Sequence, residues 1–125
     1  MWVVVGIGAR TGVGAGDVVA AISTVLHQDW HVEAIASIDR KAELVEAVAS
    51  SMGVRGVTYS AEELSAVPTP HVSQRVHDAV GSGSVAEAAA LLAGRARQLT
   101  VPRTVDGMIT VAIAAVNERA ANPPD

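Results

Sequence analysis

Glycines and one arginine gather near the start of the chain, in the stretch GIGARTGVG that begins at Gly6. Gly6, Gly8 and Gly12 have the spacing of a loop whose backbone comes close to a ligand, and Arg10 lies between them. Successive backbone amides in such a loop, with the N-terminus of a following helix, attract phosphate or carboxylate groups. The stretch predicts an anion-binding loop, although the same glycines would also suit a tight turn between a strand and a helix.

The spacing leaves the identity of the anion open. A nucleoside triphosphate loop needs a lysine after its last glycine, and here Val13 follows Gly12. A Rossmann dinucleotide site would use Asp39 to bind a ribose hydroxyl, but the third glycine comes one residue late for G-x-G-x-x-G. A nucleotide-binding Rossmann-like protein is therefore an alternative, and we assign no cofactor.

Further polar residues follow the next two predicted strands. Asp39 and Lys41 come directly after the second strand, and Ser60 follows the third. Ligands of an open α/β sheet bind beyond the carboxyl ends of its strands, which lie at one edge when the strands are parallel. We therefore expect Arg10 and Lys41 to be near neighbours that face a negatively charged group.

Groups that could perform acid–base chemistry are few. The weak candidates are Lys41, Ser60, Glu63 and Glu87. Ser60 and Glu63 also have the S-x-x-E spacing of a helix capping box. Glu87 fits a first-turn acid in a helix capped by Ser84, where the helix dipole would stabilise it. The sequence thus contains no obvious catalytic pair.

A metal site is not predicted either. The chain has no cysteine, which excludes thiolate ligands, disulfides and a cysteine nucleophile. Its histidines show no ligand spacing such as H-x-x-x-H on one helix; they are His27, His31, His71 and His77.

The composition limits the classes of partner. A chain of 125 residues fits a single domain, and half of its residues are apolar although aromatic residues are rare. The formal net charge of −4 argues against nucleic acid. No run approaches the roughly 18 apolar residues of a membrane span, and the N-terminus lacks the basic start of a signal peptide. We expect a cytoplasmic protein that binds neither nucleic acid nor membrane.

Strand and helix patterns alternate along the chain. Strands are predicted at 2–5, 33–38, 56–59, 98–101 and 108–114, and helices at 17–28, 41–52, 60–64, 73–80 and 84–94. This order predicts an α/β three-layer sandwich around a mixed, mostly parallel sheet of about five strands, with a C-terminal antiparallel hairpin. We expect one domain over residues 1–116 and a loose tail over 117–125.

Five motifs carry a resemblance to a known family. GIGARTGV, ASIDRKAE, YSAEELSAVPTP, SQRVHDAVGSGSVAEAAALLA and LTVPRTVDGMITVAIA occur in this order, between Val3 and Ala114. Together they resemble the CobE and CbiG C-terminal domain family of cobalamin biosynthesis. The resemblance implies an α/β sandwich with a mixed sheet, as the strand and helix patterns also predict.

The resemblance also implies a function. CbiG proteins open the δ-lactone of cobalt-precorrin-5A, release acetaldehyde and carry an additional N-terminal region, whereas a free-standing chain of this length resembles CobE, from the aerobic pathway. This implies a protein that binds a corrinoid or precorrin intermediate and works beside other cobalamin-pathway enzymes. The alternative is a hydrolase that acts on a precorrin lactone, as in CbiG.

The site implied by the strand ends and by the resemblance suits a ring edged with carboxylates. Arginine binds a carboxylate bidentately, whereas lysine acts as a point charge. The chain departs from the family pattern at Arg103, where lysine is usual, and at Tyr59, where phenylalanine is usual. The expected ligand-binding residues are Gly6, Gly8, Arg10, Gly12, Asp39, Lys41, Ser60, Ser84 and Arg103.

Overall fold

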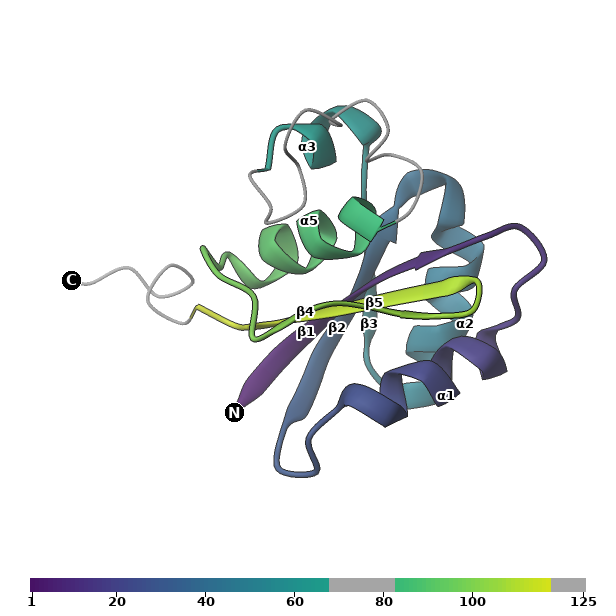
Figure 1. Cartoon of the computed structure of the whole chain (residues 1–125), viewed down its shortest axis with the longest axis horizontal. Coiled ribbons are helices and arrows are strands. Elements are labelled where there is room, and N and C mark those ends of the chain that lie inside the picture. Colours follow the sequence, from purple (N-terminus) through teal and green to yellow (C-terminus); the bar gives the residue numbers. More distant parts are fainter. Residues whose placement is uncertain (68–82, 118–125) are drawn as a thin grey trace.

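The chain forms one five-stranded sheet between two layers of helices (Figure 1). The structure is a computed structural model and describes residues 1–67 and 83–117. Helices α1 and α2 cover one face of the sheet, and α3 and α5 cover the other. The elements are β1 (Trp2–Ala9), α1 (Ala15–Val25), β2 (His31–Ile38), the 3-10 helix η1 (Asp39–Lys41), α2 (Ala42–Met52), β3 (Arg55–Tyr59), α3 (Ala61–Ser65), α5 (Gly83–Gly94), β4 (Val101–Asp106) and β5 (Ile109–Ala115).

The strand order is β3-β2-β1-β5-β4. β1 pairs parallel with β2, and β2 pairs parallel with β3. β5 runs antiparallel to both β1 and β4. The sandwich, the mixed sheet and the C-terminal hairpin are therefore confirmed, but only half of the pairings are parallel, so the sheet is less parallel than predicted. The helix predicted at 73–80 and nearly all of the predicted tail lie outside the described residues.

The first strand is longer than predicted. It continues through Gly6 and Gly8 to Ala9, so these two glycines are strand residues and not part of a loop. Gly6 is explained by packing, since a Cβ atom there would lie 1.9 Å from the carbonyl oxygen of Ala86 on α5. The sequence pattern could not separate a glycine required by a helix above the sheet from a glycine required by a turn.

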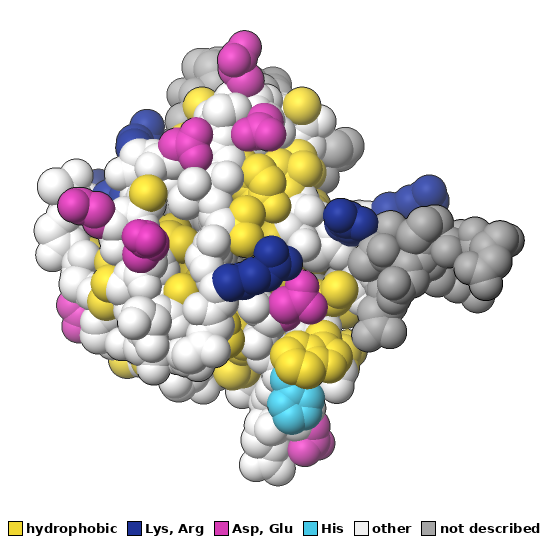
Figure 2. All heavy atoms as spheres, turned by 180° about the vertical axis from the view of Figure 1, so that it is seen from behind, with side chains coloured by type: hydrophobic (Ala, Val, Ile, Leu, Met, Phe, Trp, Pro, Cys, Tyr) yellow, Lys and Arg dark blue, Asp and Glu magenta, His cyan; other side chains and the backbone are white. Residues whose placement is uncertain are grey.

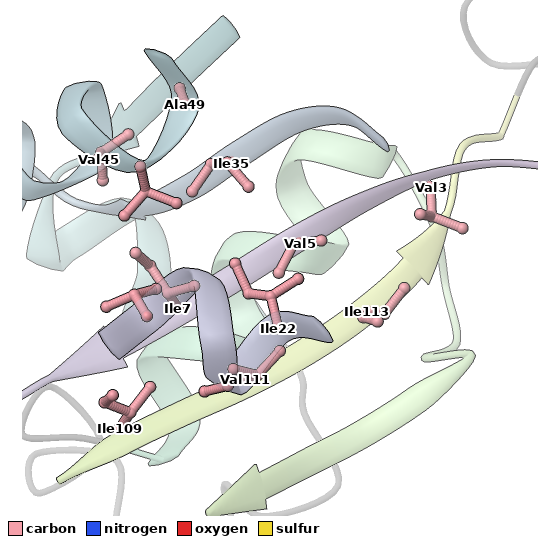
Figure 3. Close-up of a cluster of buried hydrophobic side chains, with 13 residues drawn as sticks. Val3, Val5, Ile7, Ile22, Ile35, Val45, Ala49, Ile109, Val111 and Ile113 are labelled. Atoms are coloured by element: carbon pink, nitrogen blue, oxygen red, sulfur yellow. The ribbon is translucent and has the colours of Figure 1, made fainter. Parts of the chain in front are cut away.

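The two faces of the sheet are packed with side chains of different size. Branched Val and Ile side chains from alternate strand positions fill the space under α1 and α2 (Figure 3). The face under α5 carries mainly alanines, in a cluster of Val4, Ala34, Ala86, Ala90, Ala112 and Ala114. These small side chains allow α5 to lie close to the sheet.

Some helix ends were predicted correctly, but the helix predicted at 17–28 runs from Ala15 to Val25. α2 ends at Met52 with Gly53 in the left-handed conformation, at φ 72°, as its position predicts. Ser60 and Glu63 form the predicted capping box at the start of α3. The fourth strand was placed too early, at 98–101, because β4 is an exposed edge strand with little apolar patterning. Among the described residues, no helix combines the length and apolar character of a membrane span.

We predict that Gly6→Ala destabilises the fold severely. The new methyl group would overlap the backbone of α5, and overpacking a tight core costs about 3 kcal/mol or more when backbone must move. Gly16→Ala is the matched control, because a Cβ atom there meets nothing within 4 Å and alanine favours a helix by up to about 1 kcal/mol. Urea denaturation measures both variants, and equal stability of Gly6→Ala and the wild type would contradict the packing account.

Candidate functional site

Segments that are distant in the sequence meet at the carboxyl end of β1. The parallel pairing places the ends of β1, β2 and β3 at the same end of the sheet, as predicted. The turn between β4 and β5 joins them, since the backbone N–H of Arg10 donates to the carbonyl of Met108 at 3.1 Å. The first part of α5 also reaches this end, where Val85 lines a small hollow together with Gly8 and Ser37.

A hollow of about 230 Å³ lies between the end of β1 and the β4–β5 hairpin. We call it the arginine hollow, because the guanidinium-bearing residues Arg10 and Arg103 both line it. Val105 and Met108 add apolar side chains that are 62% and 56% exposed. The remaining lining residues are Gly8, Ala9, Gly107 and Thr110.

A second, much smaller hollow lies on the other side of the end of β1. It is lined by Gly8, Ala9, Ser37, Ile38, Arg40, Lys41 and Val85, and we call it the lysine hollow. The two hollows share Gly8 and Ala9, so Arg10 and Lys41 lie on opposite sides of one strand end. Every charged residue among the described lining residues of either hollow is a cation.

The lysine hollow lies just beyond the point where β1 and β2 stop pairing. The ladder between these strands runs as far as Gly6 opposite Ala36, whereas β1 continues beside β5 to Ala9. Beyond that point the buried Ser37 hydroxyl donates to the carbonyl of Ile7 at 2.7 Å. This side chain satisfies a carbonyl of β1 near the point where the β1–β2 ladder ends.

The other predicted ligand-binding residues have different surroundings. Gly6 is buried under α5, and Gly12 lies in the exposed loop before α1 with φ 94°. Asp39 is exposed at the start of η1. Ser84 is the second residue of α5 and not the residue before it, because the helix already begins at Gly83. A Rossmann-like nucleotide site would need its first glycines in a turn directly after the first strand, but Gly6 and Gly8 lie within β1.

The weak catalytic candidates are not gathered in one hollow. Ser60 and Glu63 bind each other, since the Glu63 backbone N–H donates to Ser60 Oγ at 3.1 Å and the Ser60 N–H donates to Glu63 Oε1 at 2.8 Å. Of the four candidates, only Lys41 is a described lining residue of either hollow.

Glu87 differs most from its sequence interpretation. It was expected as an acid in the first turn of a helix, but it lies further along α5 and its side chain is fully buried. Its Oε2 atom accepts the backbone N–H of Arg103 at 3.1 Å. The pattern missed this because nothing local to Glu87 indicates that β4 packs beside it.

Several lining residues were not singled out from the sequence. Ser37 and Arg40 belong to the ASIDRKAE motif, so the motif itself was a signal for them. Val105 lay outside the predicted strands, and Met108 and Thr110 lay within the strand predicted at 108–114, because their approach to Arg10 depends on how the hairpin meets β1.

The back of the molecule carries charges of both signs. Figure 2 shows the side behind that of Figure 1, where acidic and basic side chains are scattered among hydrophobic ones. In the part of the chain that the structure describes, no three acidic, histidine or cysteine side chains gather as metal ligands. His31 and His27 instead contact the rings of Trp2 and Trp30, with centroids 5.3 and 5.5 Å apart.

A comparison with protein-family models identifies the family of this chain. The model of the family described as cobalamin synthesis G C-terminus matches residues 3–114. The chain belongs to this family. The match contains both hollows and all the described strand ends that form them. No curated protein sequence matches the chain.

Solved structures of cobalamin biosynthesis proteins share the fold of this cobalamin synthesis G C-terminus domain. The protein chiG of Agrobacterium tumefaciens is 30% identical, with a TM-score of 0.65 over 92% of this chain and 98% of that one. CobE is 24% identical, with a TM-score of 0.71 over 90% and 88% of the two chains. A putative cobalamin biosynthesis protein G homolog from Sulfolobus solfataricus is 22% identical, with a TM-score of 0.71; the match covers 94% of this chain and 37% of that one.

Tyr59, at the end of β3, has a raised pKa. Burial raises the pKa of its phenol above the ordinary value of 10.0. The positive charge of Arg55 lowers it, the negative charge of Glu63 raises it, and Arg95 lowers it, in decreasing order of effect. The phenol is therefore held neutral beside α3.

We predict that Tyr59 ionises above pH 10 in the folded domain and near pH 10 in urea. It is the only tyrosine, so phenolate absorbance at 295 nm reports it alone, and Tyr59→Phe removes the signal. Because the folded state binds this proton more tightly, the free energy of unfolding falls as the pH rises past about 10. A folded-state midpoint at or below the urea midpoint would contradict the effect of burial.

Proposed function

We propose that this chain binds a corrinoid or precorrin intermediate of cobalamin biosynthesis in the arginine hollow. The observation that carries the proposal is the lining, which combines Arg10 and Arg103 with the exposed apolar side chains of Val105 and Met108. A corrinoid acid has the complementary chemistry, since its ring is apolar and its edge carries acetate and propionate carboxylates.

The charges of both hollows favour a ligand with several carboxylates. Each guanidinium can bind one carboxylate through two parallel hydrogen bonds. A macrocycle that extends beyond the arginine hollow would cross Gly8 and Ala9, which line both hollows. Its far edge would then approach Arg40 and Lys41, in the lysine hollow. The exposed hairpin side chains would bury apolar surface against the ring face.

The dispersed candidate acids and bases favour binding without catalysis. Ser60 and Glu63 bind each other in the capping box. Glu87, a residue of α5, is fully buried. We therefore propose an accessory role, as in the aerobic pathway, in which the chain holds an intermediate and passes it to other cobalamin-pathway enzymes.

We predict that Arg10→Gln and Arg103→Gln each weaken the binding of hydrogenobyrinic acid about tenfold or more. A hydrogen bond to a charged group contributes roughly 1.5–3 kcal/mol, and each variant removes one guanidinium. Titration followed by the absorbance of the macrocycle gives the dissociation constants. Arg55→Gln is the matched control, because Arg55 pairs with Glu33 on the β3 edge and lies outside both hollows.

The methyl ester of the same macrocycle separates charge recognition from contact with the ring. It retains the ring but lacks the carboxylates, so it is expected to bind much more weakly than the acid and to lose its dependence on salt. Absence of any spectral change or co-elution with the acid would refute the proposed function.

We predict no release of acetaldehyde when the purified protein is incubated with cobalt-precorrin-5A. A lactone hydrolase needs a group that activates water near the bound ring, and only Lys41 among the four candidates lines a hollow. Acetaldehyde release above that of a heat-denatured sample would support the hydrolase alternative instead.

A further inference from the structure

Glu87 is a buried carboxylate beneath the strand that carries Arg103. It follows Ala86, the residue that packs over Gly6, and its side chain has no exposed surface. Removing a carboxylate from water is costly unless hydrogen bonds compensate it. The backbone N–H of Arg103 is one of the groups that supply this compensation, at 3.1 Å from Oε2.

β4 is irregular at the point where this contact occurs. Val101 lies opposite Ile113 and Thr104 lies opposite Val111, so three steps along β4 match two steps along β5. The extra residue makes a β-bulge that contains Pro102 and Arg103. Proline has no N–H to donate, and the N–H of Arg103 donates to Glu87. At the bulge, the backbone of this edge strand is thus fixed to α5.

The same residue lines the arginine hollow. Arg103 lines that hollow with Arg10, whose backbone is held by the carbonyl of Met108 in the hairpin turn. Both arginines therefore line the proposed ligand site and have backbones tied to separate parts of the fold. A shift of the bulge would change the distance between the two guanidinium groups.

We infer that Glu87 is a positioning residue that sets the Arg103 guanidinium for a carboxylate of the ligand. The inference rests on the proposed function for the identity of the ligand, but the contact of Glu87 with Arg103 stands without it. Glu87 acts from beneath the strand and has no exposed surface of its own in the hollow. The bulge turns the backbone N–H of Arg103 toward the Glu87 carboxylate, while Arg103 also lines the arginine hollow.

A double-mutant cycle tests whether Glu87 acts through Arg103. Glu87→Ala is made in the wild type and in Arg103→Gln, and the dissociation constant for hydrogenobyrinic acid is measured in all four proteins. We expect Glu87→Ala to weaken binding about tenfold in the wild type and less than twofold in the Arg103→Gln background. An equal loss in both backgrounds, or no loss in the wild type, would overturn the inference.

Two further variants separate positioning from general stability. Glu87→Gln keeps an acceptor oxygen and is expected to retain binding within about threefold. Glu46→Ala removes an exposed acid from α2 and is expected to leave binding unchanged. If Glu87→Gln loses as much affinity as Glu87→Ala, the backbone contact is not what matters and the inference fails.

Amide hydrogen exchange gives a readout that does not need a ligand. We expect the Arg103 amide to exchange at least tenfold faster in Glu87→Ala, with amides of β1 unchanged. If the wild type does not bind the macrocycle, the proposed function fails, and this exchange rate alone decides whether Glu87 anchors the bulge. If Glu87→Ala does not fold, the rate in Glu87→Leu decides, because leucine fills much of the same buried space but offers no acceptor oxygen. An unchanged Arg103 rate would overturn the inference in either case.

Discussion

The arrangement on one whole face of the sheet follows from how closely Ala86 packs over Gly6. The helix backbone lies so near that even a methyl group on Gly6 would overlap the Ala86 carbonyl. Alanines on β2, β5 and α5 extend this close contact beside Gly6. Since Glu87 comes next in the helix, the same contact determines where the buried carboxylate meets β4. The close packing of α5 on the sheet therefore also constrains the position of Arg103 at the arginine hollow.

The other face of the sheet has a different role. Its branched side chains bury a large apolar cluster under α1 and α2, and this cluster supplies most of the bulky core (Figure 3). A core of this kind tolerates volume-conserving exchanges better than a backbone contact tolerates an added methyl group. Stability is thus provided mainly by one face, while the alanine-rich face fixes the relative positions of the elements that form the site.

Local patterns in the sequence were sufficient for much of the fold but not for the details of the site. The capping box of Ser60 and Glu63, the left-handed Gly53 and the alternation of strands and helices depend on neighbours in sequence, and the structure confirms them. The roles of Gly6 and Glu87 depend on contacts with distant segments, so their local patterns indicated a loop and a first-turn helix acid instead. Arg10, Lys41 and Arg103 were identified by charge and by motif, whereas their division between two hollows required the course of β1 and the hairpin.

The bulge in β4 has a consequence for the outer margin of the sheet. β4 is an edge strand, and a regular edge offers a row of unpaired backbone groups to any other extended chain. Here Pro102 removes one donor, and the donor of the next residue is turned inward to Glu87. The interruption makes this margin a poor template for strand addition, so the same irregularity that orients an arginine also opposes aggregation through edge-to-edge pairing between copies of the chain.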